Sequence, residues 1–278
     1  MIQWYPGHMA KTKREIKENL SYVDMVFLIL DARVPTSSLN PDIAELIDSK
    51  PILYLFNKAS LGDLRTLEDI IEENKVKDYL IIDSLSGRNI NKIKSKVFLM
   101  LDDYINKQKQ KGYRHVIIKA MVLGIPNVGK STFINRIAKR KIASTDAHPG
   151  HTRALQWVRL DKDLHLLDTP GVLWPKFDDD KTAVNLALSG AIKESLLPKE
   201  RLAVEGFNFM NNHYPFALRR FYDIGEEDPH KFFEALSRKR GFLLEEDTLD
   251  VDKAYTLFLN DLKIGKLGGV CFDRPLCT

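Results

Sequence analysis

Residues 124–131, with the sequence GIPNVGKS, have the spacing of glycines and the Lys-Ser pair that is typical of a phosphate-binding loop. An apolar run precedes them at 116–123, and a helical pattern follows at 131–138, so the context is strand, loop and helix. Backbone N–H groups and the helix N-terminus can then hold the α- and β-phosphates. Lys130 can contact the β/γ oxygens, and the Ser131 hydroxyl can ligate magnesium. We expect nucleotide contacts from Asn127, Val128, Gly129, Lys130, Ser131 and Thr132.

Two further segments are candidates for sensing the γ-phosphate. Residues 164–171, LHLLDTPG, read as a strand that ends in D-x-x-G. Asp168 can hold magnesium through a water, and the Gly171 amide can meet a γ-phosphate oxygen. Between this motif and the phosphate loop lies a polar loop at 146–153, whose Thr152 hydroxyl is a candidate second protein ligand for magnesium.

A motif for reading a base lies upstream, where the apolar run 51–56 is followed by Asn57, Lys58, Ala59 and Ser60. GTPases usually have Asp at the last of these positions, where its carboxylate accepts hydrogen bonds from guanine N1 and N2. Ser60 offers one neutral acceptor, so an ATPase remains an alternative, and a Ser60→Asp change should tighten GDP binding. A second strand end, in the stretch 79–87, brings Ser84 and the Leu85 amide, which could meet guanine O6.

The order of these motifs is inverted, because Asn57 and Lys58 precede the phosphate loop instead of following it. The chain therefore reads as a circularly permuted P-loop GTPase, opened between the switch that senses the γ-phosphate and the strand that reads the base. Together with residues 4–11, WYPGHMAK, and 31–35, DARVP, this order closely resembles the ribosome biogenesis GTPase A (YlqF) family over nearly the whole chain. Ser60, and His151 in the first switch, depart from the family pattern.

The resemblance implies a GTP/GDP-binding switch that acts on the large ribosomal subunit late in its assembly and contacts its RNA and proteins. Many GTPases orient the attacking water with a Gln directly after D-x-x-G, but here that residue is Val172. The resemblance suggests His8 as the catalytic group, while His148 and His151 are rivals by their place in the first switch. Asn127 matches a potassium ligand of potassium-activated relatives, or it only caps the loop turn.

Composition agrees with a cytoplasmic protein without a disulfide framework. The chain has 278 residues, a formal net charge of +4 and two cysteines, Cys271 and Cys277, whose spacing does not suit a zinc site. The apolar runs are too short for a membrane span, and the N-terminus lacks a signal-peptide pattern. Basic clusters at 11–17, 139–141 and 238–240 are candidate RNA contacts, although the last two would also complement helix C-termini.

Alternating strands and helices predict an α/β fold with a doubly wound, mainly parallel sheet, followed by a small all-α domain. We expect a GTPase domain with an N-terminal basic helix at 1–175 and a helical domain at 176–278, in a monomer. A polar, basic stretch at 106–115 suits the linker that joins the old domain termini. The expected strands are 25–30, 52–56, 80–82, 116–123, 155–160 and 164–167. The expected helices include 10–21, 181–195, 199–212, 229–240 and 251–263.

These observations favour a slow GTPase switch. An RNA-binding assembly module, in which nucleotide gates affinity and hydrolysis is incidental, is the alternative from a different functional class.

Overall fold

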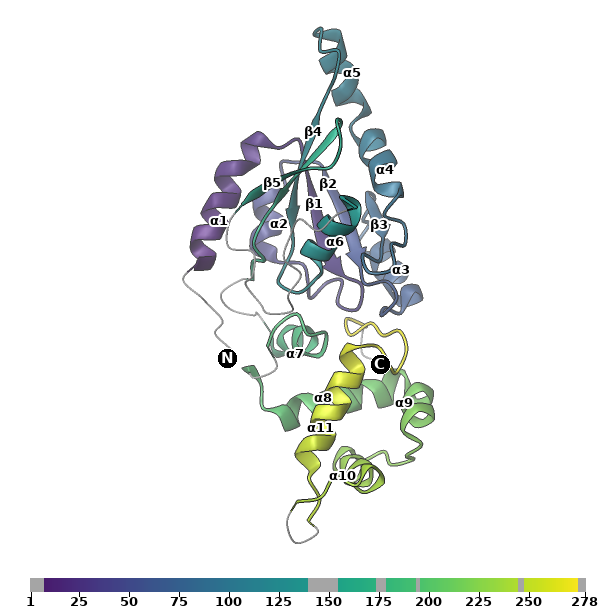
Figure 1. Cartoon of the computed structure of the whole chain (residues 1–278). Coiled ribbons are helices and arrows are strands. Elements are labelled where there is room, and N and C mark those ends of the chain that lie inside the picture. Colours follow the sequence, from purple (N-terminus) through teal and green to yellow (C-terminus); the bar gives the residue numbers. More distant parts are fainter. Residues whose placement is uncertain (1–7, 140–154, 174–178, 194–195, 245–247, 275–278) are drawn as a thin grey trace.

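The computed structural model describes residues 8–139, 155–173, 179–193, 196–244 and 248–274, with side chains from residue 11 onward. One six-stranded sheet organises the chain, with the strand order β3-β2-β1-β4-β6-β5 (Figure 1). Only the edge strand β5 is antiparallel to its neighbour. The strands are β1 (Met25–Asp31), β2 (Ile52–Asn57), β3 (Tyr79–Ile81), β4 (Ile118–Leu123), β5 (Gln156–Arg159) and β6 (Leu164–Asp168).

Both faces of the sheet are buried, which explains why β1 reads as a continuous apolar run. Met25, Phe27 and Ile29 lie in one core cluster and Val26, Leu28 and Leu30 in another, because successive strand residues point to opposite faces. The helices that cover the first face are α4 (Lys92–Met100), α5 (Asp102–Gln110) and α6 (Lys130–Ile137). Those that cover the second are α1 (His8–Asn19), α2 (Pro41–Ile47) and α3 (Leu64–Glu73), with a short 3₁₀ turn, η1 (Leu20–Tyr22), after α1.

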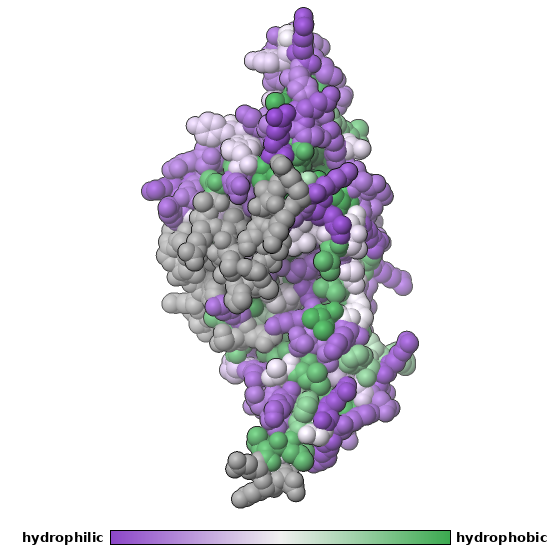
Figure 2. Space-filling model, viewed as in Figure 1, coloured by the Kyte–Doolittle hydropathy of each residue, from purple (hydrophilic) through white to green (hydrophobic). Residues whose placement is uncertain are grey.

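Part of the stretch expected to serve as a linker, 106–115, is helical, because α5 continues through Gln110. Asp102 and Asp103 lie in its first turn and Lys107 and Lys109 in its last, an order that complements the helix dipole. This end of the molecule is hydrophilic in Figure 2, where α5 lies at the top of the view.

The C-terminal part is helical, and aromatic side chains fill its core. Its helices are α7 (Asp180–Leu188), α8 (Lys199–His213), α9 (Pro215–Tyr222), α10 (Pro229–Arg240) and α11 (Val251–Lys263). The ring centroids of Phe207 and Phe232 are 4.6 Å apart, and those of Phe233 and Phe258 are 5.3 Å apart. The helix expected at 181–195 ends at Leu188 instead, because Gly190 takes a positive φ of 75° that closes it.

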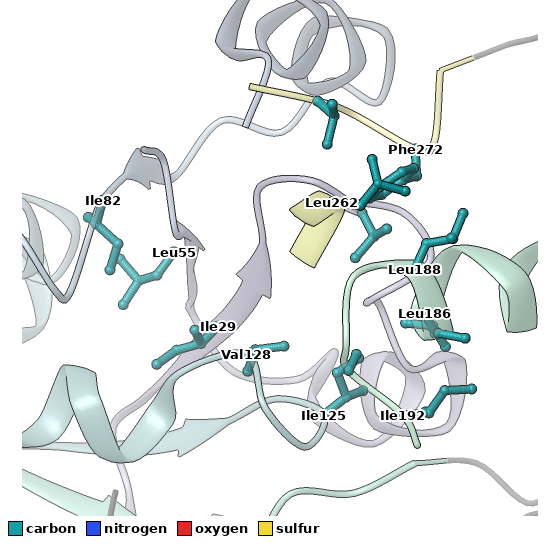
Figure 3. Close-up of a cluster of buried hydrophobic side chains, with 14 of the residues drawn as sticks. Ile29, Leu55, Ile82, Ile125, Val128, Leu186, Leu188, Ile192, Leu262 and Phe272 are labelled. Carbon is teal, nitrogen blue, oxygen red and sulfur yellow. The ribbon is translucent and has the colours of Figure 1, made fainter. Parts of the chain in front are cut away.

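The C-terminal helices share a core with the sheet. Figure 3 shows Ile125 and Val128 of the phosphate loop in the same cluster as Leu186 of α7 and Ile192 after it. The chain then returns to the loop between β2 and α3, where Val270 forms an isolated β-bridge with Gly62. The division into domains at 1–175 and 176–278 stays a prediction. No helix among the described residues has the length and apolar character needed to cross a membrane.

Candidate nucleotide site

The site forms where parallel strands end side by side. Asp31 closes β1 opposite Asn57 of β2, and Asp168 closes β6 opposite Val122 of β4. β1 and β4 are neighbours in the centre of the sheet, and β4 leads into the phosphate loop. From β1 the chain continues outward on one side through β2 and β3, whereas β6 and β5 lie on the other side, next to β4. Ligands of doubly wound sheets bind at the carboxyl ends of the strands at such a reversal of strand order.

Two glycines let the phosphate loop approach its neighbours closely. Gly124 has a φ of 155°, and a Cβ there would lie 2.5 Å from the carbonyl oxygen of Ile29. Gly129 has a φ of 96°, and its Cβ would lie 2.5 Å from Nδ2 of Asn57. The loop leads directly into α6, whose first residue is Lys130, so the N-terminus of this helix faces the site.

Lys130 is held inside the phosphate loop. Its Nζ donates hydrogen bonds to the carbonyl oxygens of Gly124, at 2.9 Å, and Ile125, at 2.8 Å. Burial lowers the pKa of Lys130 to about 8, against the attraction of Asp168. A Cβ on Gly171 would lie 3.0 Å from Nζ of Lys130, so the D-x-x-G segment lies against the phosphate loop.

Asp168 fits a magnesium site. Its side chain is buried, and its Oδ1 has no hydrogen-bond partner among the described residues. Burial raises the pKa of Asp168 to about 6, since only the Lys130 charge and a backbone hydrogen bond offset the cost of desolvation. The described residues contain no group of three or more His, Cys, Asp or Glu side chains placed to hold a metal. A metal at Asp168 would therefore complete its ligands from hydroxyls such as Ser131, from phosphate oxygens and from water.

Asn57 links the phosphate loop to the loop that contains Ser84. Its Nδ2 donates to the Val128 carbonyl at 2.8 Å, and its Oδ1 accepts from both the backbone N–H and the hydroxyl of Ser84 at 2.9 Å. From α6, the Arg136 Nε donates to the Ser84 carbonyl at 2.9 Å. The Asn57 side chain therefore holds the two loops together.

Lys58, with a positive φ of 63°, belongs to a buried charge cluster whose role sequence reasoning missed. Asp31 Oδ2 lies 2.8 Å from both the Lys58 Nζ and the Arg33 Nη2. Burial alone would raise the pKa of Asp31, but the charges of Arg33 and Lys58 outweigh it and hold that pKa well below its usual range. Arg33 also donates to the carbonyl oxygens of Ser189, at 2.6 Å, and Lys263, at 3.0 Å. The cluster thus joins the base motif to the C-terminal helices.

A cavity of about 270 Å³ lies beside these groups and has the place expected for the base. It is lined by Asn57, Lys58, Ser60, Leu61, Asp83, Ser84, Leu85, Gly129 and Thr132. Ala59 is buried beside the lining, and its backbone N–H donates to the Ile82 carbonyl. The Leu85 N–H, expected to face guanine O6, donates instead to Asp83 Oδ1 at 3.1 Å. No local pattern in the sequence indicates a role for Asp83.

Several expected residues lie outside the described part of the chain. They are the side chain of His8, whose backbone begins α1, and Thr152, His148 and His151. Val172 lies within the described residues, and its buried side chain packs in the core. Its backbone N–H donates a hydrogen bond to the Gly124 carbonyl. Asn127 has a positive φ of 59° and donates its Nδ2 to the Gly190 carbonyl at 3.1 Å.

Comparisons with known proteins agree with this geometry. A family described as "50S ribosome-binding GTPase" matches residues 119–203. Ribosome biogenesis GTPase A of Bacillus pumilus is 42% identical over 99% of this chain and 99% of its own length. The protein of that name from Thermotoga maritima is 31% identical over 99% of this chain and 95% of its length.

Two solved structures of YlqF from T. maritima have a similar fold. The GDP-bound structure has a TM-score of 0.68 and 25% identity, covering 94% of this chain and 99% of that one. The GNP-bound structure has a TM-score of 0.67, covering 95% of this chain and 98% of that one. With its inverted motif order and a phosphate loop at the strand reversal of a mainly parallel sheet, the chain belongs to the ribosome biogenesis GTPase A (YlqF) family and is a guanine-nucleotide-binding GTPase of ribosome biogenesis.

Proposed function

We propose that the chain is a slow GTP-hydrolysing switch that assists late assembly of the large ribosomal subunit, acting as a cytoplasmic monomer. The observation that carries this proposal is the continuity between the phosphate loop and the C-terminal helices. Ile125 and Val128 share a core with Leu186 and Ile192, and Asn127 contacts Gly190 directly. A change in the phosphate loop can therefore reach a helical surface that contacts the ribosome.

Within this proposal, the nucleotide phosphates lie on the loop of residues 124–131 and at the start of α6. Lys130 contacts the β/γ oxygens, and Gly171 meets a γ-phosphate oxygen. Magnesium, held by Ser131, by Thr152 and through water by Asp168, would neutralise charge on the phosphates. His8 positions the attacking water, since Val172 packs in the core and has no group to do so.

Binding to ribosomal subunits in the two nucleotide states tests the switch. In sedimentation with purified large subunits, the chain should co-sediment more strongly with a non-hydrolysable GTP analogue than with GDP. Thr152→Ala should bind GDP like the unmodified protein and lose this difference, because its hydroxyl contacts the site only when a γ-phosphate is present. If binding to large subunits is the same with either nucleotide and is unaffected by Thr152→Ala, the result would instead support an RNA-binding module with incidental hydrolysis. Equal loss of GDP and GTP affinity would remove Thr152 as a switch ligand.

Potassium should raise the rate of GTP hydrolysis above that in sodium. The Asn127 Nδ2 is already bonded to the Gly190 carbonyl, which leaves the amide oxygen as the atom able to ligate a monovalent cation. Turnover is compared in potassium chloride and sodium chloride at one ionic strength, for the unmodified protein and for Asn127→Ala. Equal rates in the two salts for the unmodified protein would exclude the cation site.

A further inference from the structure

The base-binding cavity contains a carboxylate, although position 60 is a serine. The Ser60 hydroxyl donates a hydrogen bond to Oδ2 of Asp83 at 2.6 Å, and the Ser60 backbone N–H donates to the same oxygen at 3.0 Å. Asp83 lies in the loop after β3, and β3 pairs with β2, the strand that ends in the base motif. Both Ser60 and Asp83 line the cavity. The acidic group is therefore present in the pocket, but it comes from a different loop.

Asp83 is fixed in its position by further hydrogen bonds. Its Oδ1 accepts from the backbone N–H groups of Leu85, at 3.1 Å, and Ser86, at 2.8 Å. Its side chain is buried, which opposes the charge, but these bonds and the one from Ser60 hold the pKa of Asp83 below its usual value. With two donors on each oxygen, the carboxylate has little capacity left to contact a base itself.

The bond to Asp83 determines what the Ser60 hydroxyl can offer a base. A hydroxyl has one hydrogen and two lone pairs, and the hydrogen of Ser60 already points to the carboxylate. Towards the cavity the oxygen can therefore only accept. Guanine presents N–H donors at N1 and N2 on this edge, whereas adenine has an acceptor at N1 and no amino group at position 2. Adenine would leave the Ser60 acceptor unpaired, which disfavours it.

We propose that Ser60 and Asp83 together replace the single carboxylate with which GTPases read guanine: Ser60 contacts the base, and Asp83 is the positioning residue that makes its hydroxyl an obligate acceptor. This inference rests on the assignment of the cavity as the base site within the proposed nucleotide site.

The pair reverses an expectation drawn from sequence alone, that Ser60→Asp should tighten GDP binding. With Asp83 in place, Asp at position 60 would bring a second carboxylate within hydrogen-bonding distance of the buried Asp83 carboxylate, and like charges at this distance destabilise each other. Ser60→Asp should therefore weaken GDP binding. Exchanging both residues, as Ser60→Asp with Asp83→Asn, should restore it, because the amide of Asn can donate to the new carboxylate while its oxygen accepts from Leu85 and Ser86.

The experiment measures the dissociation constants of GDP and ADP by calorimetry, with magnesium, for the unmodified protein and the variants. The unmodified protein should prefer GDP by more than about tenfold. Asp83→Asn, Ser60→Ala and Ser60→Asp should each lose about tenfold or more in GDP affinity and change ADP affinity little. The double variant should return close to the original GDP affinity, and Ser60→Thr, which keeps the hydroxyl, should retain it. Asp103→Asn, on the exposed α5, is the control for loss of one negative charge.

Thermal unfolding of each variant separates loss of recognition from loss of fold, and the double variant tests the pair even if Asp83→Asn alone is unstable. Tighter GDP binding by Ser60→Asp alone, or a double variant whose GDP affinity is not restored, would overturn the proposal that Ser60 and Asp83 together read guanine. If Lys130→Ala lowers GDP affinity by about 10²-fold or more while all Ser60 and Asp83 variants bind GDP normally, the nucleotide site stands and this inference fails. If Lys130→Ala also binds normally, the nucleotide site itself is misassigned.

Discussion

Lys130→Ala should lower the affinity for both GDP and GTP by about 10²-fold or more. A hydrogen bond to a charged group contributes roughly 1.5–3 kcal/mol. Two of the three N–H donors of Lys130 bond to the Gly124 and Ile125 carbonyls, which leaves one N–H, together with the positive charge, for the phosphates. Its ammonium group is already held in the phosphate loop by the Gly124 and Ile125 carbonyls, so little ordering is lost on binding. Fluorescence titration with a labelled nucleotide measures the loss. Ser131→Ala should weaken binding in magnesium and much less in its absence, because it removes a ligand of the metal.

Lys139→Ala is the matched control for Lys130→Ala. Lys139 is exposed and directly follows the C-terminal end of the same helix, so its loss changes the net charge equally without touching the phosphate loop. The control should bind both nucleotides normally. Equal affinities of Lys130→Ala and the control would show that the phosphates do not lie on this loop.

His8→Ala should lower subunit-stimulated GTP hydrolysis by about 10²-fold, the effect of removing one general base or water-orienting group. GTP affinity should stay nearly unchanged, because His8 contacts water and not the nucleotide in this account. Basal hydrolysis should be slow and change little. Single-turnover rates with and without large subunits measure the three effects separately.

The variants His151→Ala and His230→Ala accompany this experiment. His230 is an exposed histidine on α10, so its loss controls for removal of an imidazole from the surface. Normal stimulated hydrolysis by His8→Ala, together with a loss in His151→Ala, would move the water-positioning role to the first switch.

Elements with strong local signals were predictable from sequence. The bounds of α10 were predictable because Pro229 follows the capping residue Asp228, and because Gly241 ends the helix with a φ of 66°. Strand β1 was predictable from its apolar residues, since both faces of the sheet are buried. Helix α9 was missed because it begins at Pro215, directly after α8, so that no loop of its own marks its start.

In the nucleotide site, too, the local motifs were predictable from sequence, whereas the contacts between distant residues were not. The phosphate loop and the residues 57–60 are local patterns, and the structure places them at one edge of the sheet, as parallel strands require. The bond between Ser60 and Asp83 joins residues 23 apart, and it exists only because β2 and β3 pair in parallel. Arg33 reaches Lys263 across an even larger separation. Such contacts follow from tertiary packing, and no local spacing in the sequence indicates them.

The rate of GTP hydrolysis with purified ribosomal subunits tests the proposed switch most directly. The unmodified protein is measured alone, with large subunits and with small subunits, in potassium and magnesium. The account predicts a slow basal rate, a rise of at least about tenfold with large subunits, as expected when a partner completes a catalytic site, and no rise with small subunits. An unchanged rate with large subunits, or an equal rise with both, would contradict a GTPase switch completed by the large subunit.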